Sequence, residues 1–263
     1  MVGQQVTLTI EILAPNYMTK PPELPDFQIR NAVTRAGSTV NTSEQINGTT
    51  YAGVQVEFLI YPHCDSRPLP ALTDWLEASG RRSFPAMLLD MYPRGHIEDE
   101  PYAEGTDPFT IARWFDPANY TIRKNGEYWN LWIQGGPRGR VFFPDNPEKG
   151  PALNKIPLVR WERPYVYVSS THMLLPRSLN VVYDEDGGEK ASGCLLHAKF
   201  LSTFIAKSAE ELDRRQHYAD SQEYRAYHQG LQDAADFWCP QSRRYRDWRQ
   251  LEEVGLISRG NWA

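Results

Sequence analysis

One stretch limits the fold more than any other, the run Gly-Cys-Leu-Leu-His-Ala-Lys-Phe-Leu at residues 193–201. Residues 194–196 are apolar without alternation, which is typical of a strand buried on both faces. The period then changes to that of a helix, with one apolar stripe made by Phe200, Leu201, Phe204, Ile205, Ala209 and Leu212. His197 lies at the turn between the two, and open α/β sheets bind their ligands at such strand ends. His197 is therefore a candidate functional residue, and a hydrogen-bonded core histidine is the competing interpretation.

Composition and charge limit the classes of protein to which this chain can belong. The 263 residues fit one large domain or two small ones, and the net charge of −5 gives no electrostatic reason to expect a nucleic-acid partner. No apolar run reaches the roughly 18 residues of a membrane span. Residues 1–9 lack the basic start and apolar core of a secretion signal, and the three cysteines have no disulfide-framework spacing. We expect a cytoplasmic protein.

The first 62 residues have the pattern of antiparallel β structure. Val6, Leu8, Ile10 and Ile12 alternate with polar residues, and residues 54–60 form a second, less regular alternation. Residues 3–9, 14–15, 22–27 and 46–48 resemble the start of the BatD oxygen-tolerance family. That resemblance implies an immunoglobulin-like sandwich on an exported, membrane-anchored protein. A fragment this short leaves strand edges that have to pair with the rest of the chain or with a second copy, as in a homo-oligomer.

The pattern changes after Pro62 to mixed helix and strand. Helices are predicted over 69–76, 223–231 and 248–254, and strands over 84–92, 141–143, 156–159 and 165–168. Residues 135–140, Gly-Gly-Pro-Arg-Gly-Arg, are predicted to form a basic glycine-rich loop. We therefore divide the chain into a β-rich unit, residues 1–62, and an α/β region, residues 63–263.

This second region resembles a bacterial branch of glycosyltransferase family 2 over about three quarters of the chain. The matching segments are residues 61–65, 67–69, 72–76, 88–93, 135–140, 155–159, 195–201 and 214–218. The resemblance implies an incomplete GT-A-like mixed sheet with flanking helices. It also implies a nucleotide-sugar donor, a glycan acceptor, inversion at the sugar carbon and a divalent metal, manganese or magnesium.

The metal motif of that family is altered in this chain. An Asp-any-Asp-Glu pattern is expected just before Tyr61 and Pro62, and residues 54–57 instead are Val-Gln-Val-Glu. Valine offers no ligand atom, so Glu57 alone keeps its place, and the resemblance makes His197 a further metal ligand. Since the donor-binding half is missing as well, we interpret the chain as a chimera joined near residue 62, with catalysis impaired or absent.

Other residues are candidates for binding and chemistry. Asp90, at a predicted strand end, is the candidate catalytic base, and an aspartate that starts a turn is the alternative. Arg138 and Arg140 are candidate ligands for a phosphate or an anionic acceptor, and a solvated basic loop is the alternative. Lys155 and His172 complete the substrate-binding set.

Two classes of function remain open at this stage. The first is a glycosyltransferase-like protein, nominally moving a sugar from a nucleotide-sugar donor to an acceptor. The second is a non-catalytic protein that binds sugars or uses a β-sandwich-type surface for interaction.

Overall fold

The structure is a computed structural model, and it describes residues 7–10, 45–46, 49–50, 56–103, 106–183, 188–205, 208, 227, 229–231 and 236–262. At its centre lies a five-stranded sheet in the order β1-β4-β12-β5-β9. Its strands are β1 (Thr7–Ile10), β4 (Val56–Ile60), β12 (Gly193–His197), β5 (Ser83–Asp90) and β9 (Asn154–Val159). The β12–β5 pair is parallel and the other three pairs are antiparallel, which confirms a mixed α/β fold.

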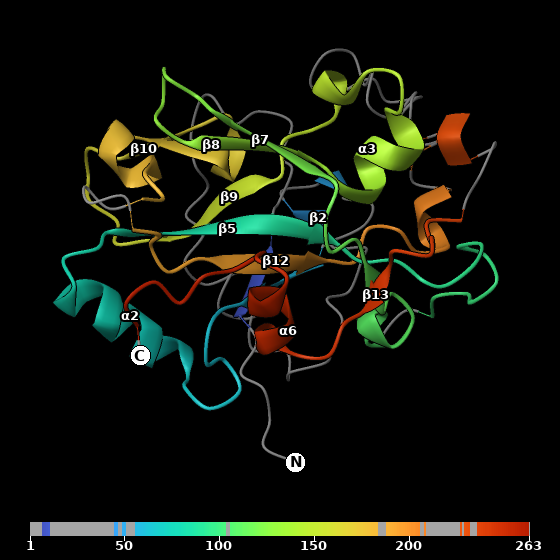
Figure 1. Ribbon diagram of the computed structural model, residues 1–263, viewed down its shortest axis with the longest axis horizontal. Helices are drawn as coiled ribbons and strands as arrows, with labels where there is room; N and C mark the ends of the chain where they lie inside the picture. The colour runs from blue at the N-terminus through green and yellow to red at the C-terminus, as the bar shows by residue number, and fades with distance from the viewer. Residues whose placement is uncertain are drawn as a thin grey trace.

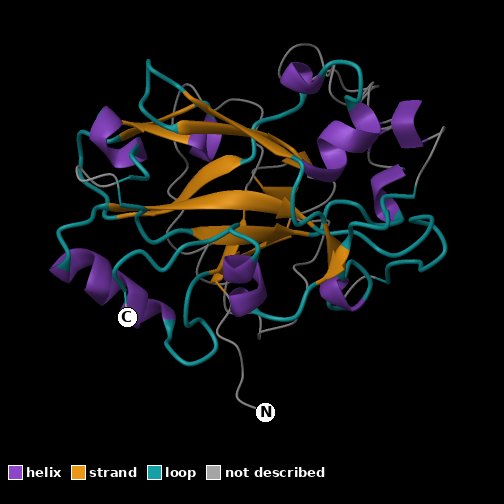
Figure 2. Ribbon diagram, in the orientation of Figure 1, coloured by secondary structure: helices purple, strands orange, loops and turns teal. Residues whose placement is uncertain are grey.

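Smaller elements surround this sheet. The helices are α2 (Leu69–Ala78), α3 (Gly136–Phe142) and α6 (Trp248–Glu253), with short 3-10 turns at Pro108–Thr110, Pro147–Lys149, Ser170–His172 and Arg177–Asn180. Four two-stranded sheets pair β2 (Gln45–Ile46) with β3 (Thr49–Thr50), β6 (Trp114–Phe115) with β13 (Arg243–Arg244), β7 (Tyr120–Lys124) with β8 (Leu131–Gly135), and β10 (Val166–Val168) with β11 (Met173–Leu175). Figures 1 and 2 show β7, β8 and α3 on one side of the central sheet, and α2 and α6 on the other.

The buried strand predicted at residues 194–196 is β12, the middle strand of the central sheet. All five residues of β12 are buried, and the strand pairs with β4 on one side and β5 on the other. Gly193 is required for this close fit, because a Cβ there would lie 2.5 Å from the Ile60 carbonyl oxygen and 2.8 Å from the Phe84 ring. Strand β4, which lies at the predicted join between the two regions, is thus built into the same sheet as the strands of the second region.

Most other element predictions are confirmed. The predicted helix at 69–76 is α2, the strand at 84–92 is β5, the strands at 156–159 and 165–168 are β9 and β10, and the helix at 248–254 is α6. Residues 203–205, 208, 227 and 229–231 are helical, in agreement with the predicted helices at 200–212 and 223–231. Residues 200–202 are not helical, so the first of these helices begins at residue 203 rather than 200, and the other residues of the two helices lie outside the described residues.

Two predictions are wrong, the loop at 135–140 and the strand at 141–143. Residues 136–142 form helix α3, which starts directly after β8. Gly135 and Gly136 have φ values of 121° and 60°, which favour glycine, and Pro137 suits the first turn of a helix. The two glycines allow a sharp turn from strand to helix. The close approach of Tyr120 also requires glycine at residue 136, because a Cβ there would lie 2.7 Å from the Tyr120 ring.

Gly136 and Gly139 both lie in α3 but have different surroundings, so substitutions at the two positions test this account of the turn. Gly136→Ala should lower the free energy of unfolding by at least about 1–2 kcal/mol, because alanine is strained at positive φ and meets Tyr120. Gly139→Ala is the matched control: nothing lies within 4 Å of a Cβ there, so it should raise the free energy of unfolding by about 0.5–1 kcal/mol. Urea unfolding measures both, and equal effects of the two substitutions would contradict this account of the turn.

Candidate functional site

Three acidic or basic side chains lie in one row across the three middle strands of the central sheet, at the carboxyl ends of β12 and β5. In β4, β12 and β5, Glu57 is the register partner of His197, and His197 is the register partner of Asp90. Register partners on neighbouring strands point to the same face of a sheet. All three are buried, with exposed fractions of 3%, 0% and 1% in that order. The structure therefore brings the two predicted metal ligands, Glu57 and His197, into one row with the predicted base Asp90.

Helix α3 adds a fourth charged residue to this face. The Arg138 guanidinium donates from Nε to Asp90 Oδ2 at 2.6 Å and from Nη2 to Asp90 Oδ1 at 2.7 Å. His197 Nδ1 lies 2.6 Å from Asp90 Oδ1 and 2.9 Å from Arg138 Nη2. We call Asp90, Arg138 and His197 the Asp90 cluster. Its bidentate, fully desolvated geometry is that of a strong ion pair.

The partners of His197 assign its tautomer. Its Nδ1 faces a carboxylate oxygen, which accepts, and a guanidinium, which donates. Arg138 keeps Asp90 ionised, so the short contact between Nδ1 and Oδ1 needs the proton on Nδ1. The lone pair of the neutral ring then lies on Nε2. Histidines that bind a metal or accept a proton are often oriented by a carboxylate in this way.

Burial and charge fix the protonation states of the cluster. Burial lowers the pKa of His197, and the positive charges of Arg138 and Lys199 lower it further against the opposing effect of Asp90. Burial alone would raise the pKa of Asp90, but the charge of Arg138 and the hydrogen bonds from His197 and Arg138 lower it below its usual value. At neutral pH the cluster is therefore an aspartate, an arginine cation and a neutral histidine.

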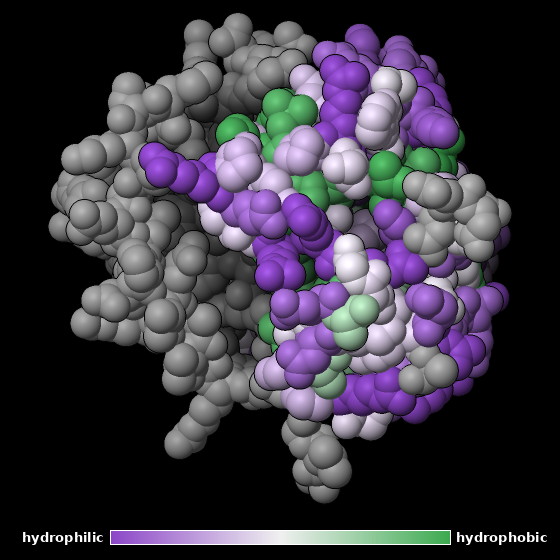
Figure 3. Space-filling view, turned by 90° about the vertical axis from the view of Figure 1, so that its left-hand side faces the viewer, coloured by the Kyte–Doolittle hydropathy of each residue, from purple (hydrophilic) through white to green (hydrophobic). Residues whose placement is uncertain are grey.

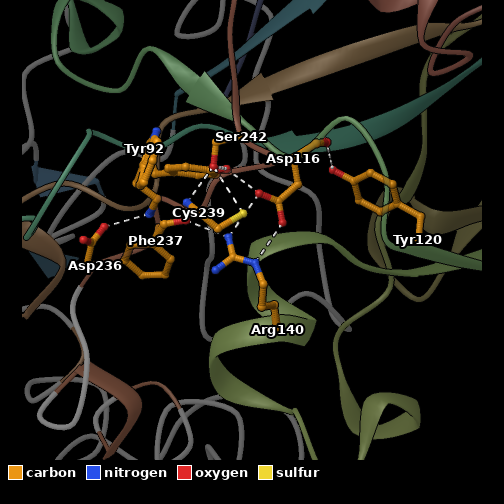
Figure 4. Close-up of polar contacts among 9 residues, drawn as sticks. Tyr92, Asp116, Tyr120, Arg140, Asp236, Phe237, Cys239 and Ser242 are labelled. Atoms are coloured by element: carbon orange, nitrogen blue, oxygen red, sulfur yellow. Dashed lines mark hydrogen bonds and ion pairs between the residues drawn. The ribbon is translucent and has the colours of Figure 1, made fainter.

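Arg140 lies two residues further along α3 and reaches a different carboxylate. It donates from Nε to Asp116 Oδ2 at 3.2 Å and from Nη2 to the Phe237 carbonyl at 2.6 Å, as Figure 4 shows. The Tyr92 hydroxyl donates to the same carboxylate and lies 2.8 Å from Ser242 Oγ. Burial raises the pKa of Tyr92, and Asp116 raises it further, so this hydroxyl stays a donor.

The two arginines are therefore not side chains of a solvated basic loop. Arg138 is buried and Arg140 is mostly buried, and each forms an ion pair with a buried aspartate. In this conformation they join α3 to β5 and to the segment after β6, rather than facing a ligand. Asp90 has a side-chain exposure of 0%, so no acceptor hydroxyl reaches it here.

Lys155 and His172 lie together elsewhere, in the wall of a cavity of ≈ 180 Å³. The cavity lies beneath the β7–β8 hairpin and beside β5, β9 and the start of β12. Lys155 is buried in β9, and the His172 ring donates from Nδ1 to the Asn154 carbonyl at 2.7 Å. The structure thus separates the predicted site residues into two groups, one around Asp90 and one around this cavity.

The divalent cation implied by the glycosyltransferase resemblance does not fit the residues present. Residues 54 and 56 are valines, and both oxygens of Asp90 are held by a guanidinium, which repels a cation. Within the described parts of the chain, no three His, Cys, Asp or Glu side chains lie close enough to hold a metal ion. We therefore derive no chemical step through a metal.

Sequence reasoning missed several buried polar residues. Asp116, Asn130 and Asn180 are almost completely buried, and the sequence analysis singled out none of them. Asp116 stands between Phe115 and Pro117, and Asn130 lies in a segment rich in aromatic residues. A polar residue flanked by large apolar ones is a weak signal of burial, and only the fold shows which partners it finds.

No family model, curated protein or solved structure matches the chain. Among the helices that the structure describes, none combines the length and the apolar character needed to cross a bilayer. What the protein does has to be inferred from its own residues and their geometry.

The buried ion pair gives the first prediction about the site. Arg138→Met should lower the free energy of unfolding by about 3–5 kcal/mol, because it leaves the Asp90 carboxylate buried without its cation. In the double variant Asp90→Asn with Arg138→Met the loss should be smaller than the sum of the two single losses. Arg246→Met, which breaks an exposed pair with Glu253, is the control and should cost no more than about 1 kcal/mol. Additive effects in urea unfolding would contradict the ion pair.

The neutral state of His197 gives a pH dependence. In the unfolded chain His197 takes up a proton as the pH falls below about 6.5, whereas the folded state resists it, so the free energy of unfolding falls with falling pH. Between pH 7.5 and 5.0 this residue should account for a loss of about 2 kcal/mol. His197→Asn keeps a donor toward Asp90 and does not titrate, so its stability should fall less over that range. Equal pH dependence in the wild type and the variant would show that His197 is not held neutral.

Proposed function

We propose that this chain is a glycosyltransferase family 2-like protein that keeps an acceptor-side, glycan-binding body and has lost metal-dependent sugar transfer. The observation that supports it best is the row of Glu57, His197 and Asp90 across three neighbouring strands. The resemblance places a metal ligand, a second metal ligand and a catalytic base at these positions. In this proposal the mixed central sheet is an incomplete GT-A sheet, and β1 belongs to an immunoglobulin-like unit.

The loss of transfer follows from the same geometry. A catalytic base has to reach the proton of the acceptor hydroxyl, and the Asp90 side chain is enclosed with both oxygens bound by Arg138. A leaving diphosphate needs positive charge, and the metal site that would supply it lacks its aspartate pair. The Asp90 cluster thus keeps the residue types of a transfer site in an arrangement that serves stability.

The protein is cytoplasmic in this proposal. Its three cysteines are free thiols, which suits a reducing compartment. A nucleotide-sugar donor is at most a weak ligand, and the acceptor glycan is the partner that the body binds.

Exposed aromatic side chains favour glycan binding without transfer. Trp129 is 49% exposed at the turn between β7 and β8, and Trp161 is 56% exposed and stacks on Tyr167. Trp129 also has a φ of 64°, a strained conformation for a large side chain. On the face that Figure 3 draws, hydrophobic residues form small groups separated by hydrophilic ones. Exposed aromatic rings of this kind suit the apolar face of a sugar.

Binding assays test this proposal with and without metal. We expect the full chain to bind immobilised oligosaccharides equally well with Mn²⁺ or with EDTA. Trp129→Gly should remove the backbone strain, keep the fold and weaken this binding, and Trp161→Ala should weaken it as well. Isothermal titration with UDP- and GDP-sugars should show no binding that depends on Mn²⁺.

Two results would contradict the proposal. If the chain binds none of the oligosaccharides, the proposed glycan-binding function is wrong. Metal-dependent binding of a nucleotide sugar that disappears in His197→Ala would show that the transfer site has been retained.

A further inference from the structure

The cavity beneath the β7–β8 hairpin lies apart from the Asp90 cluster. It borders residues of β5, β7, β8, β9 and the start of β12, and Figure 1 shows the hairpin lying over β5 and β9. Gly193 lines the cavity and is four residues before His197, which is roughly 13 Å along a strand. The ion pair of Arg138 with Asp90 therefore does not explain this cavity, which is a separate candidate site.

Most of the cavity wall that the structure describes is apolar. Its apolar side chains include Met87, Ile133, Ile156, Val182, Leu256 and Ile257. Such walls favour a ligand whose carbon surface leaves water when it binds. Lys155 and Lys190 also line the cavity, and both have interactions within the protein, so their charges do not select the ligand.

Several polar side chains of the wall already have their hydrogen bonds. Asn180 donates to two backbone carbonyls, at 2.8 and 2.9 Å, and accepts from a backbone amide at 2.7 Å. Asn154 donates to the His172 carbonyl at 3.0 Å. The Tyr120 hydroxyl points away to the Asp116 carbonyl at 2.9 Å, as Figure 4 shows. These bonds fix the wall, so the cavity exists before a ligand enters.

Asn130 is the residue of the wall that points to a ligand. It is 3% exposed and donates from Nδ2 to the Leu131 carbonyl at 3.2 Å. Its Oδ1 is buried and has no hydrogen-bond partner within the described part of the chain. Exchanging the two amide atoms would bring two oxygens together, so the unpaired atom is an acceptor. Buried acceptors are almost always satisfied, so a ligand that donates one hydrogen bond is expected.

Size and polarity limit the ligand further. An apolar cavity of about 150 Å³ holds a single benzene ring, so ≈ 180 Å³ suits one ring with a small substituent. A sugar ring carries several hydroxyl groups, and most of them would lose their hydrogen bonds to water against apolar walls. A ring with one donor matches both the volume and the single acceptor of Asn130.

We propose that this cavity binds a small uncharged compound of one-ring size with a single hydrogen-bond donor, such as a phenol. The ring packs against the apolar walls, and the hydroxyl donates to Asn130 Oδ1. This inference goes beyond the glycan-binding function proposed above and does not rest on it, because that function uses the exposed rings of Trp129 and Trp161.

NMR titration of the full chain tests the proposal with three uncharged probes: phenol, toluene and glucose. Phenol should bind, and glucose should bind at least about tenfold more weakly, because its hydroxyl groups find no partners in the cavity. Toluene has the same ring without a donor, so it measures the contribution of the apolar walls alone.

Asn130→Leu has a similar shape and removes the acceptor. In this variant the ratio of phenol affinity to toluene affinity should fall at least about tenfold, while toluene still binds and so reports an intact cavity. Asn146→Leu changes an exposed asparagine outside the cavity and should leave that ratio unchanged.

The position of the site is tested in the wild-type protein, so the result does not depend on whether a variant folds. Phenol should shift the amide signals of residues 130–133 and 154–156 and leave those of α2 unchanged. Three results would overturn the proposal: no binding of phenol at these residues, binding of glucose as tight as that of phenol, or an unchanged affinity ratio in a folded Asn130→Leu variant.

Discussion

The contact between Arg138 and Asp90 is the interaction on which the rest of the structure depends. It joins the first turn of α3 to the last residue of β5, and both side chains are buried. A buried charge is stable only when an opposite charge lies beside it, as Arg138 does beside Asp90. His197 donates a further hydrogen bond to the Asp90 carboxylate. This contact holds α3 against the carboxyl ends of β5 and β12. A helix at this place requires the sharp turn at Gly135 and Gly136, where Tyr120 packs against the backbone.

This arrangement also separates two regions on one face of the sheet. At the carboxyl end of β12, buried charges are matched to one another, as Arg138 is to Asp90 and Arg140 to Asp116. Nearer the start of the strand, Gly193 and the β7–β8 hairpin leave space, and the polar side chains there include Lys155, Asn130 and Asn154. Residues that look alike in the sequence thus lie in different surroundings: Arg138 and Arg140 form ion pairs within the fold, and Lys155 lies in the wall of the cavity.

The sequence predicted the central strand, the helix at 69–76 and the strand ending at Asp90, because their apolar periodicities are long and regular. It failed at residues 135–143, where two glycines and a proline suggest a loop, and only the contact of Gly136 with Tyr120 explains why a helix starts there. The sequence singled out Asp90, Arg138 and His197 separately. Their meeting depends on strand order and register, and periodicity does not specify either. Asn130 and Asp116 gave only the weak signal of large apolar neighbours, because their roles depend on burial that the fold creates.

The protonation state of His197 tests the central claim most directly. Nitrogen-15 NMR of the histidine side chains distinguishes the two neutral tautomers from the imidazolium. The buried Asp90 cluster predicts a neutral ring with its proton on Nδ1 at pH 7, and the same state at pH 5. A ring that is already an imidazolium at pH 6, or that carries its proton on Nε2 with Nδ1 bare, would contradict it.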